Sequence, residues 1–488
     1  MDLGTQLSRI SRHKSLFVLL LLAAALIGSV VVQGELNSFA NDAGSYLLMA
    51  RQWSPWFTPG QAELLTSPLV AYPPGYPALL AITGASHNIY LAQLIGLTCL
   101  LGFAITLFRW LHTHLGETYA LLGTTLFLFA PGTTLNLLSP VAEFPYLLLS
   151  GLVFLQLQER TKLSVATAML ALLSVLLLTR SAGIALIAAL LLARVDTSLK
   201  FAALLSLLPA IAWSLLSAAS GENGGESYLE ALVSVDITGL LVSTIQNLIS
   251  LPMAFHEFIA GPAGFTALQL ISLPLFLVLV SCALIRAWQR KVDGLYCVIY
   301  LGMLSLWPYT PGSRLLLPVL PFLLIQPLML KKRQLNYLAV VLLLPLLLGQ
   351  AEMITRWLGT PSSTVHSIES LGDPDRARGE LNRDIYAAIR QQMRESSRFT
   401  EPGARVASVK PAFFAVIADR PATALSPSPS WHCHGETPDY VFVSALTSGY
   451  NQAGLQVLEA YLEYLENVTP LPAGESAPNA YLARLRCP

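Results

Sequence analysis

Four charged residues stand at the ends of long apolar runs, where an uncompensated charge is costly. Two are carboxylates, Asp42 and Glu143, and two are guanidinium groups, Arg180 and Arg314. A carboxylate at such a boundary can take a proton from a hydroxyl or amine, and loss of water around it can raise its pKa. A guanidinium group suits phosphate because it donates two parallel hydrogen bonds. These residue types predict a general base beside phosphate-binding groups.

Each of the four residues also has a structural interpretation. Asp42 could cap the helix that follows it, and Glu143 could interact with the positive end of its own helix. Arg180 and Arg314 could reach lipid headgroups, or they could pair with the two acids. The sequence leaves these alternatives open.

Three tyrosines belong to the same region. Tyr46 follows Asp42 closely, whereas Tyr72 and Tyr76 lie in a segment, 66–77, whose prolines and glycine predict no regular helix. Tyrosine is also common at the headgroup level of membranes. We expect these side chains to position a substrate, to anchor the segment at the interface, or to do both.

Sequence signals for a metal or a cofactor are weak. His256 and Glu257 resemble the start of a zinc-binding helix, but position 260 is Ala where the second histidine would stand. No cysteine pair has zinc spacing, and no glycine-rich nucleotide motif occurs. We therefore predict no certain cofactor and assign no metal ligand, and metal dependence stays open.

The composition indicates what must position these residues. Of the 488 residues, 54% are hydrophobic and 12% are charged, which is about half the charged share of a soluble domain. Basic and acidic residues number 29 each, so no excess positive charge favours nucleic acid. We predict a mostly α, polytopic membrane protein with the bilayer, and not nucleic acid, among its partners.

About eleven apolar runs are candidates for crossing a bilayer. They cover 15–34, 89–109, 118–136, 140–158, 162–179, 181–194, 199–218, 266–286, 294–309, 314–330 and 335–350. The first run resembles a signal peptide, but no small-residue cleavage pattern follows it, so we expect a retained helix. With eleven spans, the basic clusters of the short loops fall on one side, which predicts a cytoplasmic N-terminus.

Residues 1–350 would then form a membrane domain with long outer loops at 35–88 and 221–265. Residues 351–488 hold nearly half of the charged residues and predict an extracytoplasmic α/β domain. We expect helices over 376–398 and 455–465, and strands at 406–409 and 440–443. Cys433 and Cys487 would face an oxidising compartment and could pair.

Five segments, in order along residues 1–350, resemble the GT-C superfamily of integral-membrane glycosyltransferases. They read NDAGSYLLMARQW, TSPLVAYPPGYPALLA, SPVAEFPYLLLSG, TRSAGIAL and GSRLLLPVLPFLL. Within that superfamily the chain is most similar to the protein O-mannosyltransferases and to the bacterial lipid A aminoarabinose transferases. The resemblance therefore implies a multi-pass protein of a bacterial inner membrane.

The resemblance also implies a reaction. The donor would be a polyprenyl-phosphate-linked sugar, and the acceptor a glycan, lipid or protein on the extracytoplasmic side. Asp42 matches the catalytic acid and would act as the base in an inverting displacement, with Glu143 as the second acid. Arg180 and Arg314 match the basic residues that contact lipid phosphate. Asn41 stands where a second acid is common, which argues against a tightly held divalent metal.

Other functions share part of this pattern. A transporter or flippase would place its charged groups near the bilayer midplane and often contains inverted repeats. A polymerase or ligase of lipid-linked oligosaccharides would use a similar donor, but we would expect its site in one large, later outer loop. A non-catalytic assembly partner would use the C-terminal domain only for binding.

Overall fold

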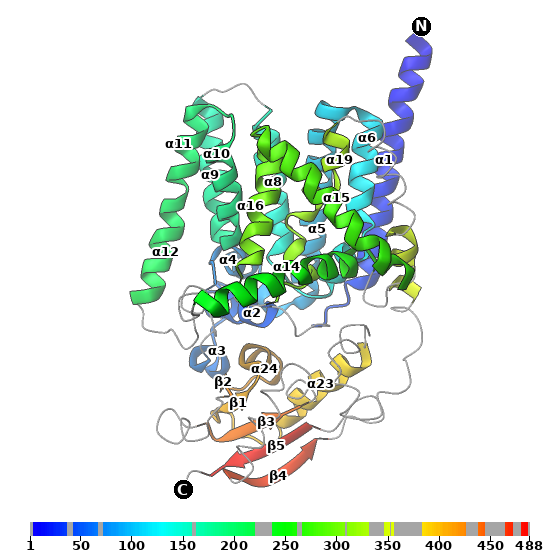
Figure 1. Cartoon of the computed structure of the whole chain (residues 1–488). Helices are drawn as coiled ribbons and strands as arrows, with labels where there is room; N and C mark the ends of the chain where they lie inside the picture. Colours follow the sequence, from blue (N-terminus) through cyan, green and yellow to red (C-terminus); the bar gives the residue numbers. More distant parts are fainter. Residues whose placement is uncertain are drawn as a thin grey trace.

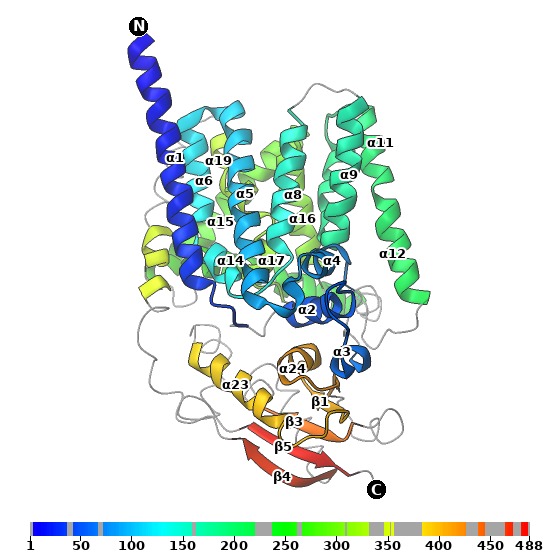
Figure 2. The same cartoon turned by 180° about the vertical axis from the view of Figure 1, so that it is seen from behind.

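The chain forms a helical bundle with a small sheet at one end (Figures 1 and 2). This computed structural model describes residues 3–36, 42–66, 72–158, 163–219, 237–260, 266–307, 310–330, 346–351, 353–355, 383–425, 438–444, 464–471 and 480–486. The sheet and its helices lie below the bundle in Figure 1. Residues 42–66 and 72–87, called the outer segment after their predicted location, lie between the two.

The bundle is built from apolar helices whose buried faces meet in one large core. They are α1 (Leu3–Val31), α5 (Ile89–Leu115), α6 (Glu117–Leu128), α7 (Pro131–Leu135), η2 (Asn136–Leu138), α8 (Glu143–Gln156), α9 (Leu163–Thr179), η3 (Ser181–Gly183), α10 (Ile184–Leu192), α11 (Thr197–Leu205), α12 (Leu207–Ala219), α14 (Ile237–Ala260), α15 (Thr266–Trp288), α16 (Val292–Ser305), α17 (Ser313–Leu316), α18 (Leu320–Leu324) and α19 (Gln326–Met329).

Within the described residues, four helical stretches are long and apolar enough to cross a membrane. They are Lys14–Val31, Ile89–Leu115, Thr197–Ser217 and Thr238–Ala260, and Glu117–Leu128 with Pro131–Leu138 would add a fifth, bent by 53°. The predicted number of eleven is therefore not confirmed. The run 314–330 breaks into three short helices because Pro318, Pro321 and Pro327 interrupt it. Most of the run 335–350 lies outside the described residues.

Helix α14 differs from the other long helices because it runs across their ends (Figure 1). One side of it buries Phe255 and Phe258, while Leu241 and Ile249 are exposed on the other. The buried Asn247 Nδ2 donates a hydrogen bond of 2.7 Å to the carbonyl oxygen of Trp307. Helix α14 also packs against α17, so it supports the turn that carries Arg314.

Four short helices form the outer segment between α1 and α5. They are α2 (Ala43–Gln52), α3 (Gln61–Leu65), α4 (Gly75–Ile82) and η1 (Ala85–His87). The prediction that 66–77 contains no regular helix is wrong at its end, since α4 begins at Gly75. Pro77 is tolerated there because the first turn of a helix needs no donor from its backbone nitrogen.

The C-terminal part contains a five-stranded mixed sheet in the order β2-β1-β3-β5-β4. The strands are β1 (Val406–Ser408), β2 (Ala422–Ala424), β3 (Tyr440–Val443), β4 (Leu465–Leu471) and β5 (Ala480–Leu485), and the helices are α23 (Arg383–Ser396) and α24 (Pro411–Ala418). Strand β1 pairs in parallel with β2 and β3, and β5 pairs antiparallel with β3 and β4.

The α/β prediction is confirmed for both expected strands and for residues 383–396 of the helix expected over 376–398, whose residues 376–382 lie outside the described residues. Residues 455–463 of the second expected helix lie outside the described residues, and its last residue, Leu465, begins β4 instead. Cys433 and Cys487 also lie outside the described residues.

The C-terminal part, hereafter the tail domain, shares a core with α2. A methyl group added to Gly44 would lie 2.8 Å from the ring and backbone nitrogen of Phe413, so the two helices touch at a glycine. Phe413 and Phe414 of α24 are buried in the same cluster as Tyr46 and Leu47 of α2. The tail domain is therefore held directly against the segment that follows Asp42.

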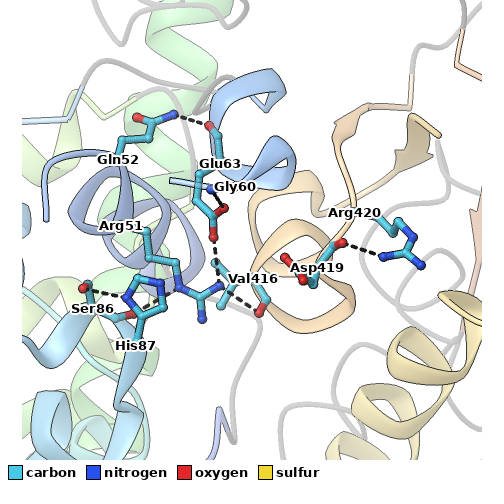
Figure 3. A network of polar contacts seen from close by, with 9 residues as sticks. All are labelled: Arg51, Gln52, Gly60, Glu63, Ser86, His87, Val416, Asp419 and Arg420. Carbon is cyan, nitrogen blue, oxygen red and sulfur yellow. Dashed lines mark hydrogen bonds and ion pairs between the residues drawn. The ribbon is translucent and has the colours of Figure 1, made fainter. Parts of the chain in front are cut away.

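Arg51, at the end of α2, joins the outer segment to the tail domain (Figure 3). Its Nε donates to the carbonyl oxygen of Ser86 at 3.1 Å, and its Nη1 donates to that of Val416 at 3.2 Å. Nη1 also lies 3.4 Å from a carboxylate oxygen of Glu63, whose side chain is only 6% exposed. Arg51 is thus a buried connector between α2, α3 and α24.

Replacing Arg51 by Met should lower the free energy of unfolding by about 3 kcal/mol, because Glu63 would remain buried without its counter-charge. Thermal unfolding of the purified full-length protein measures this loss, with the exposed Arg398→Met as the matched control. The double variant Arg51→Met/Glu63→Leu should recover part of it. An unchanged unfolding midpoint for Arg51→Met would exclude this connecting role.

Candidate active site

Asp42 stands immediately before α2, yet its side chain does not cap that helix. The backbone carbonyl of Asp42 accepts the first helical hydrogen bond, from Tyr46, but the carboxylate makes no cap contact. Instead its Oδ2 accepts a hydrogen bond of 2.8 Å from Arg314 Nη2, and its Oδ1 accepts one of 3.0 Å from the Tyr72 hydroxyl. The N-cap interpretation of this carboxylate is therefore wrong.

Glu143 is the first residue of α8 and is fully buried. Its Oε1 forms an ion pair with Arg180, which stands between α9 and η3. The same oxygen lies 3.4 Å from Arg314 Nε. The alternative that the two arginines pair with the two acids is thus what the structure contains.

The four residues form one chain of alternating charge, Asp42–Arg314–Glu143–Arg180. The two halves of this chain differ in access to solvent: the side chains of Asp42 and Arg314 are 21% and 22% exposed, whereas those of Glu143 and Arg180 are 0% and 12% exposed. Arg314 Nη1 is buried and has no hydrogen-bond partner among the described groups. A ligand would therefore meet the Asp42–Arg314 end and could use an unoccupied donor there.

The local backbone explains why residues so distant in sequence meet. A methyl group on Gly75 would lie 2.8 Å from the carbonyl oxygen of Leu178, so the start of α4 touches the end of α9 just before Arg180. On the other side, the buried Tyr300 of α16 donates a 3.0 Å hydrogen bond to the carbonyl oxygen of Leu315. That bond fixes the short helix α17 and with it Arg314.

The three predicted tyrosines pack together beside Asp42. The Tyr46 ring lies edge-on to Tyr72 and Tyr76, with centroid distances of 5.1 Å and 5.3 Å. Tyr72 contacts the carboxylate directly, and its carbonyl oxygen accepts a 3.1 Å hydrogen bond from Trp213 Nε1. Tyr46 and Tyr76 are almost completely buried, so in this arrangement they support Tyr72. Substrate positioning by these residues stays a prediction.

The charge of Asp42 follows from its neighbours. Burial alone would raise the pKa of its carboxyl group, but the positive charge and hydrogen bond of Arg314, with the Tyr72 hydrogen bond, lower it below the usual value. The expectation that the pKa of Asp42 is raised at the membrane boundary is therefore wrong, because it took account of desolvation but not of Arg314. Asp42 is ionised at neutral pH and can accept a proton.

A metal site is not assembled by the part of the chain that the structure describes, where no three His, Cys, Asp or Glu side chains gather suitably. Asp42 and Glu143 share Arg314, and Asn41 lies outside the described residues. His256 is buried on α14. Metal dependence stays open.

Sequence reasoning missed two residues near this site. Tyr300 contacts Arg180 and donates a hydrogen bond to α17. The only sequence feature that could have pointed to it is a polar side chain within a predicted span. Lys410 of the tail domain interacts with Asp42 and Arg314; burial lowers its pKa, which Asp42 partly offsets. The sequence feature that could have pointed to Lys410 is its position directly after a predicted strand, at the edge where α/β sheets bind ligands.

Comparisons with known proteins give a structural likeness only. No protein-family model matches the sequence, and no curated protein matches it as a relative. An Archaeoglobus fulgidus oligosaccharyltransferase tethered to an acceptor peptide is similar at a TM-score of 0.48 and 13% identity, covering 96% of this chain and 74% of that one. The same enzyme with zinc and sulfate gives 0.46 and 12%, covering 95% and 72%. Similarity at this level carries no argument about activity, which must rest on the site.

Proposed function

We propose that the protein is a membrane glycosyltransferase that moves a sugar from a polyprenyl-phosphate-linked donor to an acceptor on the extracytoplasmic side. The observation that carries the proposal is the contact between an ionised carboxylate and a partly exposed guanidinium group, Asp42 and Arg314, at one end of an apolar bundle. One group can accept a proton while the other binds phosphate. A donor with a prenyl tail would reach both from the bilayer.

The reaction would be a single displacement at the anomeric carbon. Asp42 takes the proton of an acceptor hydroxyl as its oxygen forms the new bond to that carbon. The bond between the anomeric carbon and the phosphate oxygen breaks, and the phosphate leaves with the electron pair. Arg314 and Arg180 stabilise the charge that develops on this phosphate, which is where fixed cations contribute most. Attack opposite the leaving group inverts the anomeric configuration.

Binding of the donor would also activate the base. In the structure Arg314 serves Asp42 and Glu143 at once. A donor phosphate would compete with Asp42 for the same guanidinium group, and loss of that cation raises the pKa of a carboxyl group. Asp42 would thus be a weak base in the free protein and a stronger one once donor is bound.

A transporter is less well supported by the same residues. Transport sites typically lie on broken helices near the bilayer midplane. Here the charged chain involves the first residue of α8, the residue after α9 and the short α17, and so it gathers at one end of the bundle.

Asp42→Asn should reduce sugar transfer by about 10²- to 10⁴-fold, the usual contribution of a general base. Asn can still accept the Tyr72 hydrogen bond, so insertion and folding should persist. Transfer from a synthetic polyprenyl-phosphate sugar measures the loss. Glu466→Gln, a partly exposed carboxylate in β4, is the matched control. Transfer at the wild-type rate by Asp42→Asn would remove Asp42 from the mechanism.

Arg314→Ala should raise the KM for the donor at least about tenfold, because a charge-assisted phosphate contact is lost. The KM for the acceptor should change little. Arg314→Lys keeps the charge that Asp42 and Glu143 require, and it should fall between wild type and Arg314→Ala. A donor KM that is equal in all three proteins would contradict the phosphate role.

The pH dependence of transfer tests activation of Asp42 by the donor. The acid limb of kcat/KM reports the free protein, where Arg314 holds the pKa of Asp42 below that of an ordinary aspartate. The acid limb of kcat reports the complex with donor and should lie at higher pH. Activity falls in both cases as pH drops, since protonated Asp42 cannot act as a base. Coinciding limbs would show that Arg314 does not leave Asp42.

A further inference from the structure

Lys410 is a cation of the tail domain that lies beside the residues of the bundle site. It is the second residue after the end of β1 and directly precedes the first residue of α24, Pro411. Strand β1 is flanked on both sides by parallel partners, β2 and β3. Lys410 therefore stands at the carboxyl end of the central parallel strand, where open α/β sheets commonly bind ligands.

The contact between α24 and α2 fixes the position of Lys410. Gly44 lies two residues after Asp42, and its Cα hydrogen faces the ring and backbone nitrogen of Phe413, three residues after Lys410. Arg51 holds the other end of α24 through the carbonyl oxygen of Val416. With both ends of this helix held, Lys410 is set against Asp42, and it interacts electrostatically with both Asp42 and Arg314.

A count of charges indicates what Lys410 adds. Asp42 and Glu143 carry two negative charges, and Arg180 and Arg314 carry two positive charges, so the chain in the bundle is neutral. Lys410 adds a further cation that interacts with Asp42 and Arg314. A cation next to the partly exposed end of the chain favours an anion there.

A second observation points to a ligand at the same place. Arg314 Nη1 is buried and lacks a hydrogen-bond partner among the described groups, although a guanidinium nitrogen is a strong donor. An anionic oxygen between Arg314 and Lys410 would satisfy this donor and interact with both cations. Phosphate fits because it presents several acceptor oxygens to such a pair.

We propose that Lys410 is a phosphate-binding residue, and that the tail domain thereby completes the donor site instead of only packing against the outer segment. This inference rests on the proposed function, since the phosphate is that of the polyprenyl donor. Lys410 and Arg314 would bind phosphate oxygens from opposite sides, one from each part of the protein. The bundle residues alone would form a neutral site with weaker attraction for the donor.

Binding of undecaprenyl phosphate, without any sugar, to the full-length protein in nanodiscs tests the proposal apart from catalysis. Lys410→Met should weaken binding about tenfold, as expected for the loss of one charge-assisted contact. Lys410→Arg should bind within about twofold of wild type. Arg486→Met removes an exposed charge from the far end of the same domain and should have no effect. Lys410→Gln, with a polar head group, provides the same test if the Met variant unfolds.

The outcomes separate this inference from the proposed function. If wild type binds undecaprenyl phosphate more tightly than undecaprenol, and Lys410→Met and Lys410→Gln bind it as wild type does, the role of Lys410 is overturned and the donor class stands. If wild type does not distinguish the phosphate from the alcohol, the donor class fails and the role of Lys410 fails with it. Selective weakening in the Lys410 variants, with wild-type binding in Arg486→Met, supports both.

Discussion

Arg314 lies between two carboxylates, and this shared cation is the interaction on which the site depends. Glu143 is fully buried, and an ionised carboxylate in such a place is tolerated only with a counter-charge. Arg314 and Arg180 supply that charge from the short helix α17 and from the residue after α9. Asp42 then balances Arg314 from the outer segment. These ion pairs thus hold four separate parts of the chain together at one end of the bundle.

The same constraint connects the tail domain to the site. Helix α24 shares a core with α2, and the two helices approach each other so closely at Gly44 that a Cβ there would clash with Phe413. Arg51 adds a buried polar junction at the other end of α24. Asp42 precedes α2 directly, so any shift of the tail domain would move the carboxylate relative to Arg314. The geometry of the Asp42–Arg314 pair therefore depends on packing in a part of the protein that lies beyond the bundle.

Much of this arrangement was accessible from sequence, but the decisive contacts were not. Charged residues at the ends of apolar runs are energetically unfavourable unless they are paired, which identified Asp42, Glu143, Arg180 and Arg314 as candidates. The sequence could not show which acid each arginine would contact. Local rules favoured Asp42 as a helix cap, and desolvation predicted a raised pKa; both failed because Arg314, distant in sequence, competes for the carboxylate. Run lengths predicted eleven spans, a number that the described residues do not confirm, and prolines break one of the runs into short helices. The position of Lys410 after a predicted strand did not show that it lies near Asp42, because the packing of α24 against α2 brings it there.

The surroundings of Arg314 suit an amphiphile with an anionic head. Helix α14, which packs against α17, turns Leu241, Ile245 and Ile249 outward while its other face joins the core. An apolar surface therefore adjoins the short helix that carries the cation. A soluble phosphosugar would gain nothing from that surface, whereas a prenyl chain would bury its methylene and methyl groups there, each worth about 0.8 kcal/mol. Under the proposed function, the apolar surface and the cation would therefore each bind a different part of one lipid-linked donor.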